Sequence, residues 1–239
     1  VALLARTLEP YRPFIEETAR EFGLPLRLVG GAPLAENPAV SALLGLLALP
    51  AGRPAWRPRE VLAALRSPYF DWTQAGVDAG QAAALDGLAR QAHILGGLAQ
   101  WREALALALS AAPVVEPADD DPEGGAPPAL DPAAAGAALE ALVARLTPPA
   151  GASLAGYIGF VEDLVGDDAT LPAAPFGGEA ASPNSLNVVE RALAEPATQV
   201  RDLAALRAFK AELRGLALSA AVLADARPDA ADWDYPTFI

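Results

Sequence analysis

The sequence predicts a mainly α-helical protein that carries a small strand–helix–strand α/β element at its N-terminal end. From Asn37 onward, apolar residues recur every three or four positions in one segment after another, which is typical of helices that pack on a shared core. Before Asn37, only two short apolar runs, VALLA at residues 1–5 and LRLVGG at 26–31, resemble buried strands. One helical segment separates them, which is the smallest arrangement that allows a parallel α/β pairing.

The helical segments begin at residues that favour helix starts. Between the two strand-like runs, Pro10 and Pro13 fit a first helical turn, and Gly23 follows an expected last turn near Phe22. Further helix starts are indicated at Asn37-Pro38, Pro58, Asp78 with Gln81, Asp131-Pro132 and Ser153.

Apolar spacing predicts which faces of these helices are buried. We expect one long helical segment from Asp78 to Ser110, because its leucines continue along the whole stretch. Residues 154–165 show the clearest amphipathic pattern in the chain. A last helix, at about residues 197–224, is expected to bury Val200, Leu203, Leu206, Phe209, Leu213 and Leu216.

The segment of about residues 112–131 differs from the rest in composition. It contains EPADDDPEGGAPPALDP, in which proline, glycine and aspartate dominate and almost nothing can be buried. This composition predicts a flexible acidic loop.

Composition excludes several kinds of site. The chain has no cysteine, which rules out disulfides and cysteine-ligated metals, and we expect a cytoplasmic protein. No apolar run approaches the roughly 18 residues that a membrane span needs, so we expect no membrane partner. Lys210 is the single lysine and lies in AFKAE, outside any phosphate-binding loop. We therefore expect no ATPase site, no bound cofactor, no metal site and no catalytic residue in this chain.

Charge is unevenly distributed along the chain. The net charge is −13, which argues against a general nucleic-acid-binding protein. Residues 1–72 nevertheless carry eight arginines against seven acidic residues, whereas residues 112–186 carry twelve acidic residues and only Arg145. Any contact with DNA is therefore expected in the N-terminal third.

Three phrases in this N-terminal third resemble a known family. ARTLEPYRPFIEE, followed by GLPLRLVGG and then by PLAENPAVSALLGLL, resembles the UvrD-like superfamily 1 helicases. Within that superfamily, PLAENPAV together with VLAALRSPYF is most similar to AddB, the helicase-like subunit of bacterial helicase–nuclease complexes. The resemblance is specific over about residues 1–72 and is weak beyond them.

The resemblance implies a domain organisation and a set of partners. Residues 1–31 would be the end of an α/β second motor domain, and residues 32–239 would be its helical insertion domain. Because the chain starts at Val1 instead of a methionine, we expect it to be part of a longer polypeptide. The parent protein would act with a partner subunit in double-strand break repair and recombination, and ATP and Mg²⁺ would bind to the parent. Arg12, six residues after Arg6, would approach the nucleotide phosphate; alternatively, Arg12 pairs with Glu16 on its own helix.

One stretch combines basic and aromatic residues in a way that suits DNA binding. Arginines can neutralise phosphates while aromatic rings stack on unpaired bases. The candidate DNA-binding residues are Arg53, Trp56, Arg57, Arg59, Arg66 and Trp72. The alternative interpretation is that the aromatic residues pack helix ends and that the arginines are only solvated.

Two functional classes follow from the sequence. The first is a non-catalytic helicase-like domain that guides DNA or contacts the partner subunit in a helicase–nuclease complex. The second is a helical protein-interaction module unrelated to DNA, for which an acidic surface is natural. The complete reading frame discriminates between them, because a phosphate-binding lysine upstream or a nuclease motif downstream favours the first class.

Overall fold

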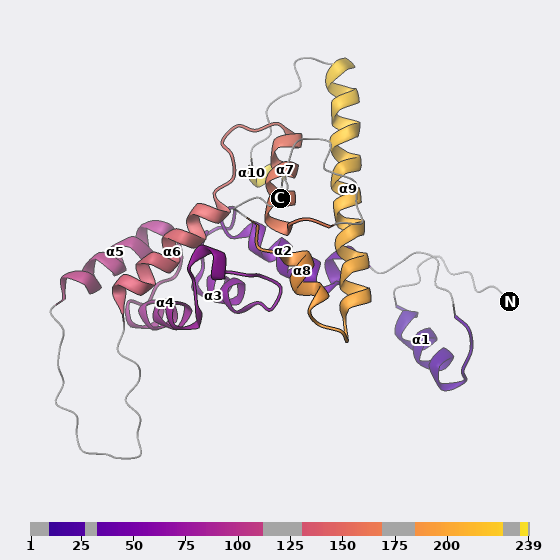
Figure 1. The fold of residues 1–239 in the computed structure, drawn as a ribbon, viewed down its shortest axis with the longest axis horizontal. Coiled ribbons are helices and arrows are strands. Elements are labelled where there is room, and N and C mark those ends of the chain that lie inside the picture. The colour runs from indigo at the N-terminus through magenta and orange to yellow at the C-terminus, as the bar shows by residue number, and fades with distance from the viewer. Residues whose placement is uncertain (1–9, 27–32, 112–130, 169–184, 227–234, 239) are drawn as a thin grey trace. The chain divides into compact units, whose positions relative to one another are not determined.

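The protein is mainly helical, as its sequence predicts (Figure 1). The computed structural model describes residues 10–26, 33–111, 131–168, 185–226 and 235–238. The two predicted strands, at 1–5 and 26–31, lie almost entirely outside these residues, as does nearly all of the predicted acidic loop at 112–131. No strand occurs in the part of the chain that the structure describes, so the predicted α/β element has no support.

The described residues form α-helices and short 3₁₀ helices. The α-helices are α1 (Arg12–Glu21), α2 (Pro38–Ala48), α3 (Pro58–Arg66), α4 (Ala79–Gln91), α5 (Leu98–Ser110), α6 (Pro132–Leu146), α7 (Leu154–Val165), α8 (Val188–Leu193), α9 (Gln199–Ala226) and α10 (Tyr235–Phe238). Two short 3₁₀ helices, η1 (Leu34–Glu36) and η2 (Thr73–Ala75), precede α2 and α4.

The chain divides into two compact units, residues 1–33 and residues 34–239. The described part of the first unit is centred on α1, which ends where Gly23 adopts a φ of +61° and Leu24 N–H donates to the Ala19 carbonyl at 2.8 Å. A positive φ is easiest for glycine, which explains why the helix stops there.

The second unit has a continuous apolar core. Helix α4 packs on α3 and α6, α5 packs on α6, and α9 packs on α2, α7 and α8 (Figure 1). Trp101 of α5 is fully buried, and its indole N–H donates to the Trp56 carbonyl at 2.8 Å. Buried leucines of α2, α4, α6 and α7 belong to the same core cluster as Trp101.

Local hydrogen bonds confirm the predicted helix starts. The Asn37 side chain accepts from the N–H groups of Ala39 and Val40 at 3.0 and 3.3 Å. Asp78 and Gln81 form a reciprocal capping box, with both bonds at 2.8 Å. Asp131 and Ser153 cap α6 and α7 in the same manner. Each bond satisfies an N–H group that the first turn of a helix leaves without an internal partner.

The prediction of one helix from Asp78 to Ser110 is wrong, because a non-helical segment separates α4 from α5. Gly96 and Gly97 there have φ values of +150° and +85°. The Gly97 N–H donates to the Ala55 carbonyl at 2.6 Å, and a Cβ on Gly96 would lie 3.0 Å from the same oxygen. Gly96 thus allows a close backbone approach and Gly97 allows a positive φ, and the apolar periodicity conceals this interruption.

Burial along α9 differs from the predicted face at both ends. Leu203 and Leu206 are buried as expected, whereas Val200 is 83% exposed and Leu216 is 55% exposed. The buried residues of this 28-residue helix are Asp202, Leu203, Leu206, Lys210 and Ala217, so its apolar pattern is longer than the face that is buried in the described part of the chain. The buried stripe predicted for residues 154–165 is confirmed at nearly every position.

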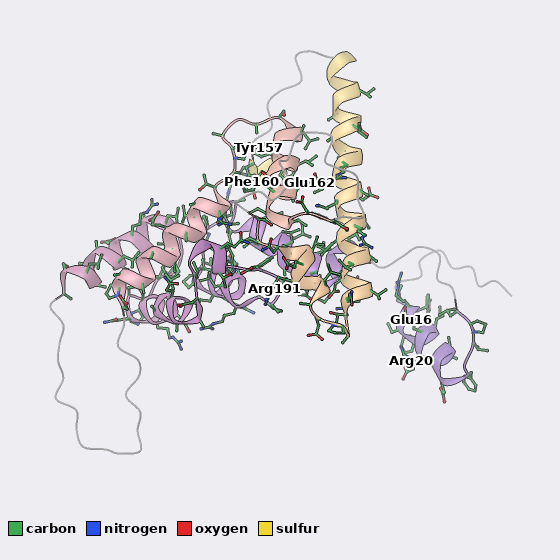
Figure 2. All side chains as sticks on the ribbon, in the orientation of Figure 1. Glu16, Arg20, Tyr157, Phe160, Glu162 and Arg191 are labelled. Carbon is green, nitrogen blue, oxygen red and sulfur yellow. The ribbon has the colours of Figure 1, made fainter. Side chains whose placement is uncertain are left out.

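An aromatic cluster holds α10 against α7. Tyr157 and Phe160 of α7, labelled in Figure 2, face Tyr235 and Phe238, with the Tyr157 and Phe238 rings stacked at 5.3 Å. The buried Tyr235 hydroxyl donates to the Leu47 carbonyl at 2.9 Å. Residues about 190 apart in sequence therefore form one contact, which fixes α10 relative to both α2 and α7. No helix among the described residues is long and apolar enough to cross a membrane.

Candidate functional site

The candidate DNA-binding segment begins in the loop that connects α2 to α3. The Trp56 N–H donates to the Leu49 carbonyl at 3.0 Å, and the Arg57 guanidinium donates to the Arg53 carbonyl at 2.7 Å. Arg57 also forms an exposed ion pair with Glu60 at 3.5 Å. Arg53, Arg57 and Arg59 are all exposed, so this turn and the start of α3 present three guanidinium groups to solvent.

The two tryptophans of this segment are buried instead of exposed. Trp56 is 5% exposed and Trp72 is 4% exposed. The Trp72 indole N–H donates to the Ala64 carbonyl at 3.0 Å, and its ring contacts Phe70 edge to face at 6.3 Å. An indole enclosed in this way has no free face for a base. The burial of both indoles agrees with the alternative that they pack helix ends, and DNA binding by this segment stays a prediction.

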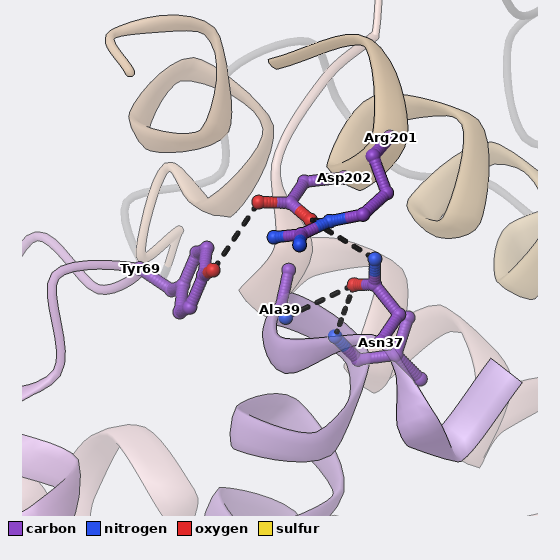
Figure 3. Close-up of polar contacts among 6 residues, drawn as sticks. Asn37, Ala39, Tyr69, Arg201 and Asp202 are labelled. Carbon is purple, nitrogen blue, oxygen red and sulfur yellow. Dashed lines mark hydrogen bonds and ion pairs between the residues drawn. The ribbon is translucent and has the colours of Figure 1, made fainter. Parts of the chain in front are cut away.

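Tyr69 belongs to a buried polar junction centred on Asp202 (Figure 3). Asp202 lies in the first turn of α9 and its side chain is 0% exposed. It accepts hydrogen bonds from the Asn37 amide at 2.9 Å, the Tyr69 hydroxyl at 3.2 Å and the Arg201 guanidinium at 2.8 Å. Three segments that are distant in sequence thus meet at one carboxylate.

The electrostatics of this junction follow from its hydrogen bonds. Burial by itself would raise the pKa of Asp202, but hydrogen bonds from Arg201, Asn37 and Thr198 outweigh it and lower the pKa below its ordinary value. Burial and the adjacent Asp202 carboxylate raise the pKa of Tyr69. Both groups therefore keep their ordinary charge at neutral pH, and the junction stabilises the start of α2 against α9.

A second cluster of charges joins α3 to α4. The Asp86 carboxylate accepts from the Arg66 guanidinium at 2.7 Å and, at the same oxygen, from the guanidinium of Arg90. Asp86 is buried, whereas the side chains of Arg66 and Arg90 are 56% and 76% exposed. Sequence reasoning singled out Arg66 but missed Asp86 and Arg90. Their spacing of four residues on one helix is the signal that could have indicated this pair.

The single lysine has a structural position at the end of α7. Lys210 is 4% exposed, and its ammonium group donates to the Gly166 carbonyl at 2.6 Å. Gly166 follows the last residue of α7, so the ammonium group caps the negative end of that helix. Burial lowers the pKa of Lys210, and the carboxylate of Glu162 acts in the opposite direction.

Two further cations of α9 support this contact between α9 and α7. Arg207 binds Asp168 at 2.7 Å, and Arg214 binds Glu162, which is labelled on α7 in Figure 2. With Lys210, the three cations lie at i, i+3 and i+7 and therefore share one face of α9. Glu162 and Asp168 are thus engaged in holding α7 and its C-terminal continuation against α9.

Arg12, the predicted nucleotide-phosphate residue, is the first residue of α1 in the first unit. Its side chain is partly exposed, and its predicted role in the parent protein stays a prediction. Glu16 and Arg20, labelled in Figure 2, lie on the same helix. Within the described residues, no group of three or more His, Asp or Glu side chains is placed to hold a metal ion.

The described residues of the candidate site therefore fall into two classes. Arginines at the start of α3 and at the ends of α3 and α4 are exposed, whereas the aromatic residues beside them belong to the core. Comparison with known proteins finds no matching family model, curated protein or solved structure for this chain.

Proposed function

We propose that this chain is a non-catalytic helicase-like part of a bacterial DNA helicase–nuclease complex that processes double-strand breaks. Its role is to guide DNA or to contact the partner subunit of the complex. The resemblance of ARTLEPYRPFIEE and PLAENPAV to UvrD-like helicases supports this proposal. ATP and Mg²⁺ would bind to the parent protein, with Arg12 near the nucleotide phosphate.

The observation that carries the proposal is a stripe of aromatic residues along α1 that are exposed in the described part of the first unit, with Phe14 inside the helix and Tyr11 and Phe22 at its N-cap and C-cap. Tyr11, Phe14 and Phe22 are 58%, 68% and 67% exposed. At 100° per residue, these positions lie within about 80° of one another around the helix. Three large aromatic side chains on one helix face mark a contact surface, because soluble proteins seldom leave such a stripe uncovered. The neighbour that the resemblance implies is the remainder of an α/β motor domain.

An experiment on the complete reading frame tests this assignment. The double substitution Phe14→Glu and Phe22→Glu should leave the thermal midpoint of the 239-residue chain nearly unchanged, because both rings are already exposed in it. In the full-length protein, the same substitutions should lower the midpoint and weaken copurification with the partner helicase subunit. Leu95→Glu is the matched control, since Leu95 is 77% exposed and lies in the second unit.

The outcomes separate the two functional classes. Equal behaviour of the double variant and the Leu95→Glu control in the full-length protein would contradict the proposal. A reading frame with neither a phosphate-binding lysine upstream nor a nuclease motif downstream would favour a helical protein-interaction module. The net charge of −13 and the buried tryptophans favour that second candidate over a protein that binds single strands by stacking.

A further inference from the structure

Two exposed arginines share one buried carboxylate, so that the positive groups lie at the surface and the negative group lies beneath them. Arg66 and Arg90 both donate to the same oxygen of Asp86. The side chain of Asp86 is 13% exposed, whereas those of the two arginines are 56% and 76% exposed. The negative group is therefore set back, and the two positive groups lie toward solvent. The three side chains together carry one net positive charge.

The buried carboxylate also holds the arginines in place before any ligand arrives. Two free guanidinium groups repel each other, and each long side chain loses rotamer freedom when it is fixed. Asp86 offsets both effects, because it attracts both groups and comes from the interior of α4. A guanidinium presents five N–H donors, so each arginine retains donors beyond those used on Asp86. Such preorganisation lowers the cost of binding an anion.

A third arginine extends this surface along α3. Arg59 is exposed and precedes Arg66 by seven residues, which places the two on the same side of the helix. Seven residues of helix span roughly 10 Å, which is about three nucleotide steps along one strand of B-DNA. The surface formed by Arg59, Arg66 and Arg90 therefore presents three exposed guanidinium groups, two of which follow one face of α3.

We propose that Arg59, Arg66 and Arg90 bind the backbone phosphates of duplex DNA, with Asp86 positioning the last two. This inference rests on the proposed function and names its DNA substrate. The buried indoles of Trp56 and Trp72 remove the stacking that would favour single strands. Phosphate contacts alone favour the duplex, because counterion release per contact is about 0.9 for B-DNA against about 0.7 for a single strand.

Fluorescence anisotropy with the 239-residue chain tests the proposal. The probes are a labelled duplex and a single strand of the same length, titrated over a series of salt concentrations. Wild-type protein should bind the duplex more tightly, with a dissociation constant on the order of 10⁻⁴–10⁻⁶ M. Each of Arg59→Gln, Arg66→Gln and Arg90→Gln should weaken duplex binding at low salt and flatten the slope of log K against log salt by about 0.9.

The control is Arg102→Gln. Arg102 is also exposed and also pairs with a carboxylate, that of Glu140, but it lies on α5. This variant changes the net charge equally and should retain the wild-type slope. Arg59→Gln does not touch Asp86, so it tests the surface even if removal of a partner of Asp86 lowers stability. Thermal melts of every variant verify the fold.

Each outcome decides between specific alternatives. Equal losses in the control and in the three variants would show that only net charge matters and would overturn the proposed surface. A stronger preference for the single strand, or displacement of the duplex by millimolar inorganic phosphate alone, would also overturn it. If the chain associates with the partner subunit but binds no duplex, this inference fails while the proposed function survives as a subunit contact.

Discussion

The replacement Asp202→Ala should lower stability more than any surface substitution in this protein. It removes the acceptor for the Asn37 amide at 2.9 Å and for the Tyr69 hydroxyl at 3.2 Å. A partly buried donor left without an acceptor costs about 1–3 kcal/mol. Arg201 is more than half exposed and can return to water, so the loss of its ion pair adds little.

The expected loss is therefore the cost of leaving the Asn37 and Tyr69 donors unsatisfied, minus the cost of burying the carboxylate, which the substitution removes. This amounts to about 3 kcal/mol in the free energy of unfolding. For a chain of 239 residues, it corresponds to a decrease of roughly 6–12 °C in the thermal midpoint.

Thermal and urea unfolding followed by circular dichroism measure this effect. Asp202→Asn should fall between wild type and Asp202→Ala, because its amide oxygen retains one acceptor. The control Arg102→Ala, which breaks an exposed ion pair, should leave the midpoint within experimental error. An Asp202→Ala midpoint equal to that of the control would refute the reasoning, because it would mean that Asn37 and Tyr69 find other partners without cost.

Three further predictions follow from the same structure. The pKa of Asp202 is lowered on folding. Its contribution to stability is therefore present above about pH 4 and is lost as the pH falls through the lower pKa of the folded protein. In urea unfolding between pH 5 and pH 2, the free energy of unfolding should fall less steeply with decreasing pH in Asp202→Asn than in wild type. Lys210→Met keeps the aliphatic stem but leaves the Gly166 carbonyl without its donor, and should lower the free energy of unfolding by about 2 kcal/mol in urea titrations. Gly45→Ala should raise the thermal midpoint by the equivalent of about 0.5–1 kcal/mol, because Gly45 lies within α2 with open space around it. Gly96→Ala should lower the midpoint, because its Cβ would meet backbone at 3.0 Å. Opposite results in calorimetry would contradict the structural roles given to these two glycines.

The sequence by itself determined where most of the helices begin. A capping side chain bonds to an N–H group only two or three residues ahead, so the signal at Asn37, Asp78, Asp131 and Ser153 is complete within a few residues. Amphipathic spacing in residues 154–165 is equally local, and it identified the buried face of α7 correctly.

Tertiary structure decided which side chains are available for function. In the sequence, the aromatic and basic residues of 53–72 were equally plausible DNA contacts. In the structure, the core buries Trp56 and Trp72 and leaves Arg59 exposed. Periodicity indicates which apolar residues share one face of a helix. Whether another helix lies there to cover it depends on contacts between distant segments.

The same reason explains the polar contacts that the sequence did not reveal. Asn37 meets Asp202 across 165 residues, and Lys210 meets Gly166 across 44. The Arg66–Asp86 pair joins two helices in the same way. No local pattern specifies such pairs, because the two residues are brought together only when the helices that carry them pack against each other. The sequence therefore determined the helices and a set of candidate arginines, and only the packing of those helices separated the exposed cations from the aromatic residues of the core.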